Sequence, residues 1–165
     1  MKNLFLSIVV SLIMAPQICA AGEAVNMDKA IDQRSYRLGG VASFAEMVSA
    51  GVKQLALSAA MSSAAMDELD EDIRRIAREA GIDAYREPDL IVTDLFPADV
   101  AKGKHVMLLY KGSTLDEYMA LKQKRNELLK ANKYLGEARK EIARQFGQLL
   151  SYPAANIESR LKVNL

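Results

Sequence analysis

The chain's only cysteine, Cys19, lies at the end of an apolar N-terminal segment with the layout of a cleaved secretory signal peptide. Lys2 supplies a positive charge, residues 4–15 form an uncharged apolar run, and Ala20 precedes the expected cleavage site. A run of about twelve residues is too short to span a hydrocarbon core, which needs roughly twenty. Cleavage after Ala20 removes the cysteine, so the exported domain, residues 21–165, has to be held together by packing without disulfides.

An alternative interpretation makes Cys19 a lipid-modified N-terminal residue. That chemistry usually takes a small residue directly before the cysteine, where this chain has Ile18. We therefore expect ordinary cleavage and a periplasmic or secreted protein.

Charge and hydropathy limit the classes of partner. Without Lys2, 21 basic residues balance 21 acidic ones, so the exported domain has no net charge to attract nucleic acid. No second apolar stretch approaches spanning length, and we expect no transmembrane span in the mature chain. The sequence also predicts no cofactor and no metal site. The acidic run 67–72 lacks the alternating ligands of a calcium loop, and the scattered methionines are typical of core packing.

The N-terminal third of the exported domain is predicted to be helical. Asn26 can cap a helix that begins at Met27, and the pair Gly39–Gly40 is expected to interrupt it. A second helix then places apolar residues on one stripe and ends at Gly51; these residues are Val41, Phe44, Ala45 and Val48.

Three strands and an intervening helix are predicted in the middle of the chain. The strands are expected at residues 52–58, 89–95 and 105–110. The helix follows Ser62 or Ser63 as its N-cap, has acidic residues in its first turns and basic ones in its last, and ends at Gly81. The first two strands should form a parallel crossover, and the short link between the second and third should give an antiparallel hairpin.

The C-terminal third, residues 114–165, reads as helical. Residues 114–150 carry two apolar stripes separated by Asn132 and Gly136, which mark a kink or a break, so one helix or two remain open. Pro153 suits the first turn of a closing helix that turns Ile157 and Leu161 inward. The predicted fold is therefore α/β (α+β), with a small three-stranded mixed sheet, packed helices and a helical C-terminal third, in one domain.

The candidate site follows from this topology, because ligands collect outside the carboxyl ends of parallel strands. Those ends would be residues 58–62 and 94–96, with the start of the third strand beside them. We expect ligand contacts from Ser58, Ser62, Asp94, Lys104 and His105.

Two functions remain open at this site. An acid-base hydrolase could use His105 oriented by Asp94, with a nearby serine as nucleophile. The simpler interpretation makes His105 a turn residue, Asp94 a partner of a loop amide and the serines helix caps. No G-x-S-x-G motif is present to support a nucleophile. The preferred prediction is a non-catalytic module that binds a small ligand or a protein partner.

The helices of residues 114–150 offer a second route to a partner. Their surplus apolar residues could pair with another chain, or the helices could fold back on the domain as an intramolecular hairpin. The residues concerned are Leu128, Leu129, Tyr134 and Leu135.

Overall fold

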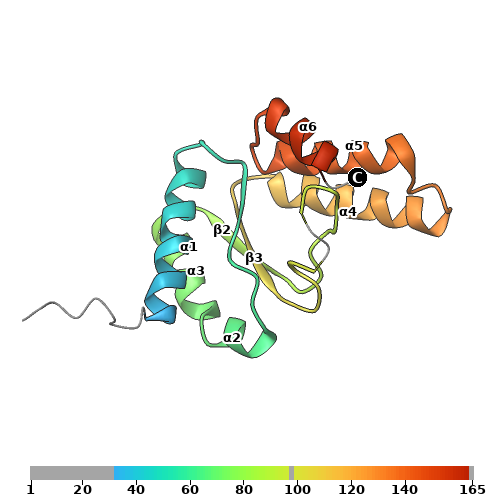
Figure 1. Ribbon diagram of the computed structural model, residues 1–165. Coiled ribbons are helices and arrows are strands. Elements are labelled where there is room, and N and C mark those ends of the chain that lie inside the picture. Colours follow the sequence, from blue (N-terminus) through green and yellow to red (C-terminus); the bar gives the residue numbers. More distant parts are fainter. Residues whose placement is uncertain (1–31, 97–98, 164–165) are drawn as a thin grey trace, which may run out of the picture. The chain divides into compact units, whose positions relative to one another are not determined.

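The computed structural model describes the chain over residues 32–96 and 99–163. The predicted signal segment 1–20 and the predicted helix start at Met27 lie outside these residues. The elements are shown in Figure 1: α1 (Gln33–Ser49), β1 (Leu55–Leu57), α2 (Ser63–Asp67), α3 (Asp70–Glu79), β2 (Asp83–Glu87), β3 (Val106–Tyr110), α4 (Thr114–Lys130), α5 (Gly136–Leu149) and α6 (Ala154–Val163).

The three strands form one sheet in the order β1-β3-β2. Both pairs are antiparallel, with Leu57 opposite Leu108 and Tyr85 opposite the same residue on the other side. The fold class, a three-stranded sheet with packed helices and a helical C-terminal third, is confirmed. The mixed sheet is wrong: β1 and β2 run in the same direction, but β3 lies between them, so no parallel pair forms.

The second strand also lies elsewhere than the sequence predicted. It is Asp83–Glu87, and Pro88 follows its end. Residues 89–95 belong to the connection between β2 and β3, which we call the connection 88–105 and which is irregular over its described residues 88–96 and 99–104. The apolar side chains of Leu90, Ile91 and Leu95 are buried all the same. They are covered by loop packing instead of strand pairing, and a short apolar run alone does not distinguish these two forms of burial.

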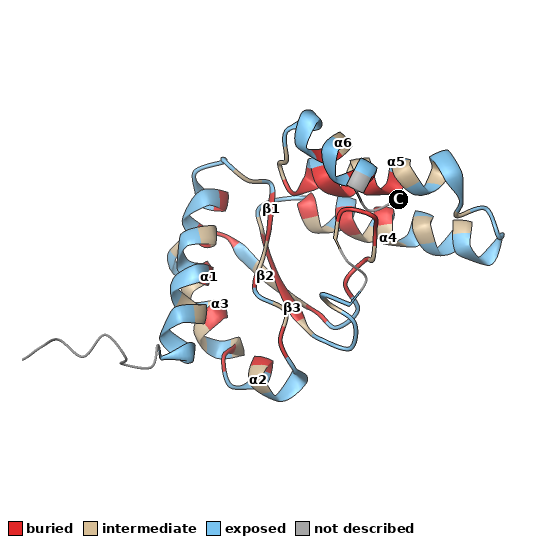
Figure 2. Cartoon of the chain, viewed as in Figure 1, coloured by how far each residue is buried: buried red, intermediate tan, exposed pale blue. Residues whose placement is uncertain are grey.

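Side chains of the central strand alternate between two cores. Val106 and Leu108 belong to a cluster with the second helical layer, by which we mean α4, α5 and α6. Met107 and Leu109 belong to a cluster with the first helical layer, α1, α2 and α3. Because successive strand residues point to opposite faces, β3 is buried on both sides, as Figure 2 shows by its colour.

The first helical layer begins with a helix that the glycine pair does not interrupt. Asp32 caps α1 by accepting hydrogen bonds from the backbone N–H groups of Arg34 and Ser35. Gly39 and Gly40 lie inside the helix, where each glycine costs about 1 kcal/mol relative to alanine. Burial of the predicted stripe stabilises the helix against that cost; its buried members are Val41, Ala45 and Val48.

The predicted caps and breaks elsewhere are largely confirmed. Ser62 caps α2 through Ala65 N–H, although a turn at Glu68 separates α2 from α3. Gly81, at a φ of 68°, follows the end of α3.

In the C-terminal third, the break predicted at Asn132 and Gly136 is confirmed: both have positive φ angles, Asn132 lies between α4 and α5, and Gly136 is the first residue of α5. Ile157 and Leu161 of α6 are buried as predicted. Leu128 and Tyr134 pack on the core of the second layer, whereas Leu129 and Leu135 are exposed. None of the described helices combines the length and the apolar character that a bilayer crossing needs.

Candidate functional site

Ser58 lies where β1 leaves its regular pairing with β3. Its backbone N–H donates to Met107 O (2.9 Å), and its Oγ accepts from Met107 N–H (2.9 Å), which is the bond that its own carbonyl would accept in a regular ladder. Met61 then pairs with His105, a shift of one residue in register. The Ser58 hydroxyl therefore fixes a β-bulge-like irregularity, and it also donates to Ala59 O at 3.0 Å.

Ser62 and Lys104 have local backbone partners. The Ser62 Oγ accepts from Ala65 N–H at 3.2 Å and so serves the start of α2. The Lys104 Nζ donates to Val100 O at 3.3 Å, and its side chain is exposed. The Ser62 contact agrees with the simpler interpretation, in which the serines are helix caps.

His105 faces the first helical layer. Its Nδ1 accepts a hydrogen bond from Arg86 Nε at 2.8 Å. The same guanidinium bonds Ser63 O and Oγ and pairs with Asp67 of α2. The Arg86 guanidinium therefore joins His105 to α2.

Asp94 belongs to the other side of the sheet. Its buried carboxylate forms an ion pair with Arg139 of α5. Its neighbour Leu95 packs in the core of the second layer. The contacts of Asp94 thus tie the connection 88–105 to α5.

The expected Asp94–His105 pair depended on a hairpin between residues 89–95 and 105–110, and that hairpin is wrong. Because β2 ends before Asp94, no strand carries Asp94 to the start of β3. His105 binds Arg86 on the side of the first layer, whereas Asp94 binds Arg139 on the side of the second. The predicted pair is therefore divided between opposite faces of the sheet.

An apolar cavity of about 200 Å³ lies between the end of β1 and the connection 88–105. Its walls come from the two segments that the sequence had marked as ligand-prone, but the side chains are mostly apolar. Apolar residues such as these form no sequence motif. The cavity they line could therefore be recognised only from the folded structure of the connection. The lining residues are Leu57, Ser58, Ala59, Ala60, Leu90, Ile91, Val92, Thr93, Phe96, Val100, Ala101 and Val106.

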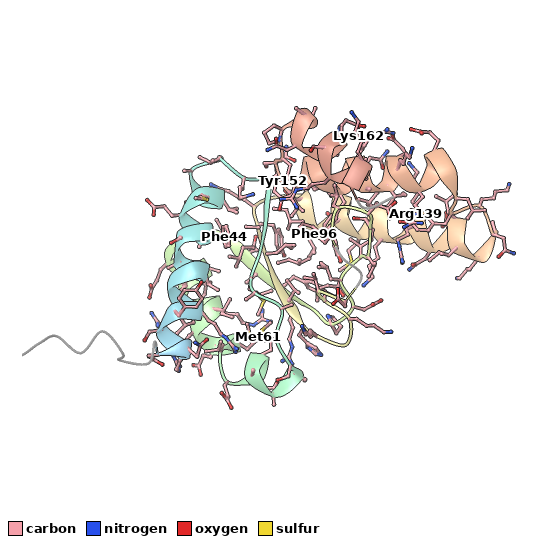
Figure 3. All side chains as sticks on the ribbon, viewed as in Figure 1. Phe44, Met61, Phe96, Arg139, Tyr152 and Lys162 are labelled. Carbon is pink, nitrogen blue, oxygen red and sulfur yellow. The ribbon has the colours of Figure 1, made fainter. Side chains whose placement is uncertain are left out.

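The outer wall of the cavity is held by aromatic contacts. The Phe96 ring packs edge-on against Phe146 of α5 (centroids 6.5 Å apart) and against Tyr152 (6.3 Å). Figure 3 labels Phe96 and Tyr152 beside the second helical layer. Arg160 of α6 lies over both the Phe96 and Tyr152 rings, at 5.7 and 5.4 Å from their centroids. These contacts attach Phe96, and with it the connection, to α5 and α6.

A buried polar cluster holds the start of the same connection. Glu87, 1% exposed, accepts from the Tyr118 hydroxyl (3.0 Å), from Lys122 Nζ (2.9 Å) and from Asp89 N–H (2.8 Å). The Tyr118 oxygen in turn accepts from Ile91 N–H at 3.2 Å. Burial raises the pKa of Tyr118 above its ordinary value, and the neighbouring Glu87 carboxylate raises that pKa further. The phenol is therefore a donor to Glu87 at neutral pH.

Comparisons of the chain with protein-family models, with curated proteins and with solved structures find no match. Within the described residues, no group of three or more His, Cys, Asp or Glu side chains is arranged to hold a metal ion. The function is therefore inferred from the chemistry of the cavity and of the surfaces beside it.

Proposed function

We propose that this protein is a non-catalytic binding module that holds an apolar chemical group in the cavity between β1 and the connection 88–105. The observation that carries the proposal is the lining, which is almost wholly aliphatic or aromatic and includes no titratable side chain among the described residues. Apolar pockets with a few polar groups are the usual form of a small-molecule or side-chain binding site.

The size of the cavity limits what it can hold. An apolar cavity of about 150 Å³ accommodates benzene, so a cavity of about 200 Å³ has room for a single ring or a short branched alkyl group. The Ser58 hydroxyl already has two partners, and the Thr93 hydroxyl, at 3.4 Å from Leu95 N, faces the backbone of its own loop. Binding is thus expected to depend on shape and apolar contact, with little contribution from hydrogen bonds.

Long irregular connections inside a compact fold are usually functional. The connection 88–105 carries half of the cavity wall, yet Glu87, Asp94 and Phe96 anchor it to the second helical layer. Such anchoring favours a preformed site, which lowers the entropic cost of binding.

A panel of small probes tests this function. Toluene, indole and short branched alcohols are titrated into isotopically labelled protein, with glycerol as a polar control. The NMR chemical shifts of the backbone amides are followed. Shifts confined to residues 57–60 and 90–101 are expected for the apolar probes alone. Ala101→Leu fills the cavity and should abolish these shifts, whereas Ala131→Leu, at the exposed end of α4, should leave them unchanged. Equal responses to glycerol, or no effect of Ala101→Leu, would contradict the proposal.

We also propose that the module acts outside the cytoplasm after cleavage near Ala20. The support is the charge, the apolar run and the small residue at the start of the sequence. Intact-mass measurement of protein from the extracytoplasmic fraction should give a chain that begins at Ala21. A mass that retains residues 1–20, or a lipid adduct on Cys19, would contradict it.

A further inference from the structure

We propose that the free edge of β1 binds an extended peptide segment of a partner protein, which joins the sheet as a fourth strand beside Leu57. This inference rests on the proposed function, because it assigns the apolar cavity to one side chain of the bound peptide. Addition of a strand to an exposed sheet edge is a recurring mode of peptide recognition, with backbone bonds for affinity and alternating pockets for specificity.

The backbone N–H and C=O groups of Leu57 point away from β3. Ser58 N–H donates to Met107 O, so residue 58 faces β3, and its strand neighbour must face the opposite edge. β3 is the only described strand that pairs with β1. The N–H and C=O groups of Leu57 are therefore available to one residue of an added strand.

Two other backbone groups at the edges of the sheet have partners within the chain. On the outer edge of β2, Arg74 of α3 donates to Ala84 O at 3.1 Å. Just before β1, Gln54 N–H donates to Ser151 Oγ at 2.9 Å. Proteins protect sheet edges because unpaired edges recruit other chains. Unlike Ala84 O and Gln54 N–H, the outward N–H and C=O groups of Leu57 have no hydrogen-bond partner among the described residues.

Two hollows flank the free edge of β1 at Leu57, one on each face of the sheet. The apolar cavity lies on one side, and a groove of about 700 Å³ lies between β1 and the N-terminal half of α1 on the other. Residues 57–59 line both hollows. A strand added at Leu57 would therefore run between them.

The groove beside α1 has room for a side chain and is lined by one positively charged residue, Arg37. Gly39 and Gly40 line it, and nothing lies within 4 Å of a Cβ at either position. Tyr36, 68% exposed, and the half-buried Phe44, labelled in Figure 3, add aromatic surface. Arg37 also lines the groove and forms no ion pair with any described residue. This chemistry favours an acidic side chain.

The geometry of a strand fixes how these preferences combine. The peptide residue opposite Leu57 directs its side chain to the same face as the Leu57 side chain, which packs with the second layer and lines the cavity. The next peptide residue points to the other face, toward the groove and Arg37. The expected ligand is an extended segment in which an apolar residue stands directly beside an acidic one.

A second copy of this chain is less favoured than an acidic peptide as the partner of the β1 edge. Pairing of β1 with β1 around a two-fold axis would bring the Arg37 side chains of both copies onto the same face of the joined sheet. Like charges placed together disfavour association, whereas an acidic peptide neutralises Arg37.

The test uses a library of blocked synthetic hexapeptides, varied at each position over apolar, acidic, basic and small residues, with fluorescence anisotropy as the readout. The expected binders carry adjacent apolar and acidic residues. In the tightest peptide, N-methylation at the residue that bonds Leu57 should weaken binding about three- to tenfold, the value of one net hydrogen bond. N-methylation at either adjacent residue should have little effect, because their N–H groups point to solvent.

Protein variants separate the parts of the site. Leu57→Pro removes the outward N–H and should weaken peptide binding, since proline is tolerated on an edge whose N–H faces solvent. Should that variant unfold, Arg37→Glu is the alternative: it should reject acidic peptides and accept basic ones. Arg34→Glu, which removes the partner of Asp72 outside the groove, is the matched control and should leave peptide preference unchanged.

The outcomes distinguish this inference from the proposed function. Binding of toluene in the cavity without binding of any peptide would overturn the fourth strand and leave the cavity's function standing. Peptide binding that ignores the position of N-methylation and the charge of residue 37 would also overturn it. A dimer that Leu57→Pro dissociates would replace the peptide with a second copy and overturn the choice of occupant.

Discussion

The two helical layers cover the same sheet by different means. The first layer packs α1 and α3 against Met107 and Leu109 with apolar side chains, and its charged residues lie at the surface. The second layer shares its face of the sheet with the connection 88–105, and its helices form ion pairs with the buried carboxylates of Glu87 and Asp94. The cavity beside the connection is lined almost wholly by apolar side chains, whereas the groove beside α1 is also lined by polar and charged side chains such as Ser35 and Arg37. This difference indicates that the apolar space proposed to hold a ligand comes from the inserted loop.

The largest effect should come from breaking the buried polar cluster of the second layer. Glu87→Leu leaves the Tyr118 hydroxyl and Lys122 without their carboxylate, and loss of one partner from a buried charged pair costs about 3–5 kcal/mol of unfolding free energy. Ile73→Val in the first layer should cost only about 0.5–1.5 kcal/mol. Urea denaturation of both variants measures the two losses.

A triple variant is the control for that experiment. Glu87→Leu combined with Tyr118→Phe and Lys122→Met removes the carboxylate and both of its side-chain partners at once, and such replacements are often neutral or stabilising. The backbone N–H groups of Asp89 and Ile91 still lose their acceptors, so recovery should be incomplete. Recovery of most of the lost stability would show that the single variant suffers from uncompensated polar groups. A single variant as mild as Ile73→Val would instead break the proposed contrast between the layers.

Glycine substitutions should have opposite signs in the two layers. A Cβ on Gly147 of α5 would lie 2.8 Å from Ile157 Cγ1 and Cδ1, so Gly147→Ala should destabilise by about 1–3 kcal/mol through overpacking. A Cβ on Gly39 of α1 meets nothing within 4 Å, so Gly39→Ala should stabilise by about 0.4–1 kcal/mol through helix propensity. Thermal melts of both variants check the signs, and two changes of the same sign would contradict the comparison.

The two faces of the sheet also differ in how well the sequence predicts them. In the first layer, the stripe of Val41, Ala45 and Val48, the cap at Ser62 and the stop at Gly81 follow from local patterns, and the structure confirms them. The break between the helices at Asn132 could be predicted equally well, because it depends on residues close in sequence. Local chemistry was sufficient for these features.

The connection 88–105 could not be predicted in that way. Its apolar residues have the spacing of a buried strand, and only the contacts of Glu87 with Tyr118 and of Asp94 with Arg139 show that it folds as a loop. Those partners are distant in the chain. The cavity depends on the same distant contacts. Its walls come from the segments predicted to bind a ligand, but Ser62, Lys104 and His105, which were predicted to contact it, are not among the lining residues.

The buried phenol of the second layer should make stability fall at alkaline pH. Tyr118 has a raised pKa in the folded protein, so above about pH 10 the unfolded chain loses a proton that the folded chain keeps. Unfolding free energy should then fall by about 1.4 kcal/mol per pH unit from this residue. Tyr118→Phe should lose that part of the slope, whereas Tyr36→Phe, at an exposed position of the first layer, should keep it. Denaturation at pH 9 to 11 measures the slopes, and equal slopes in all three proteins would contradict the assignment.

The smallest effect should come from an exposed ion pair of the first layer. Hydrogen bonds from Arg34 and then Arg75 hold the pKa of the Asp72 carboxyl below its ordinary value. Arg34→Ala should raise that pKa toward the ordinary value, as followed by the carboxyl carbon shift of Asp72. A lowered folded-state pKa stabilises above the ordinary pKa of about 3.9 and loses that contribution as the pH falls below it, so any difference in stability should disappear in acid. Salt should reduce the shift, since exposed charges are screened. A pKa of Asp72 that ignores both Arg34→Ala and salt would contradict the assignment of its lowered value to these exposed hydrogen bonds.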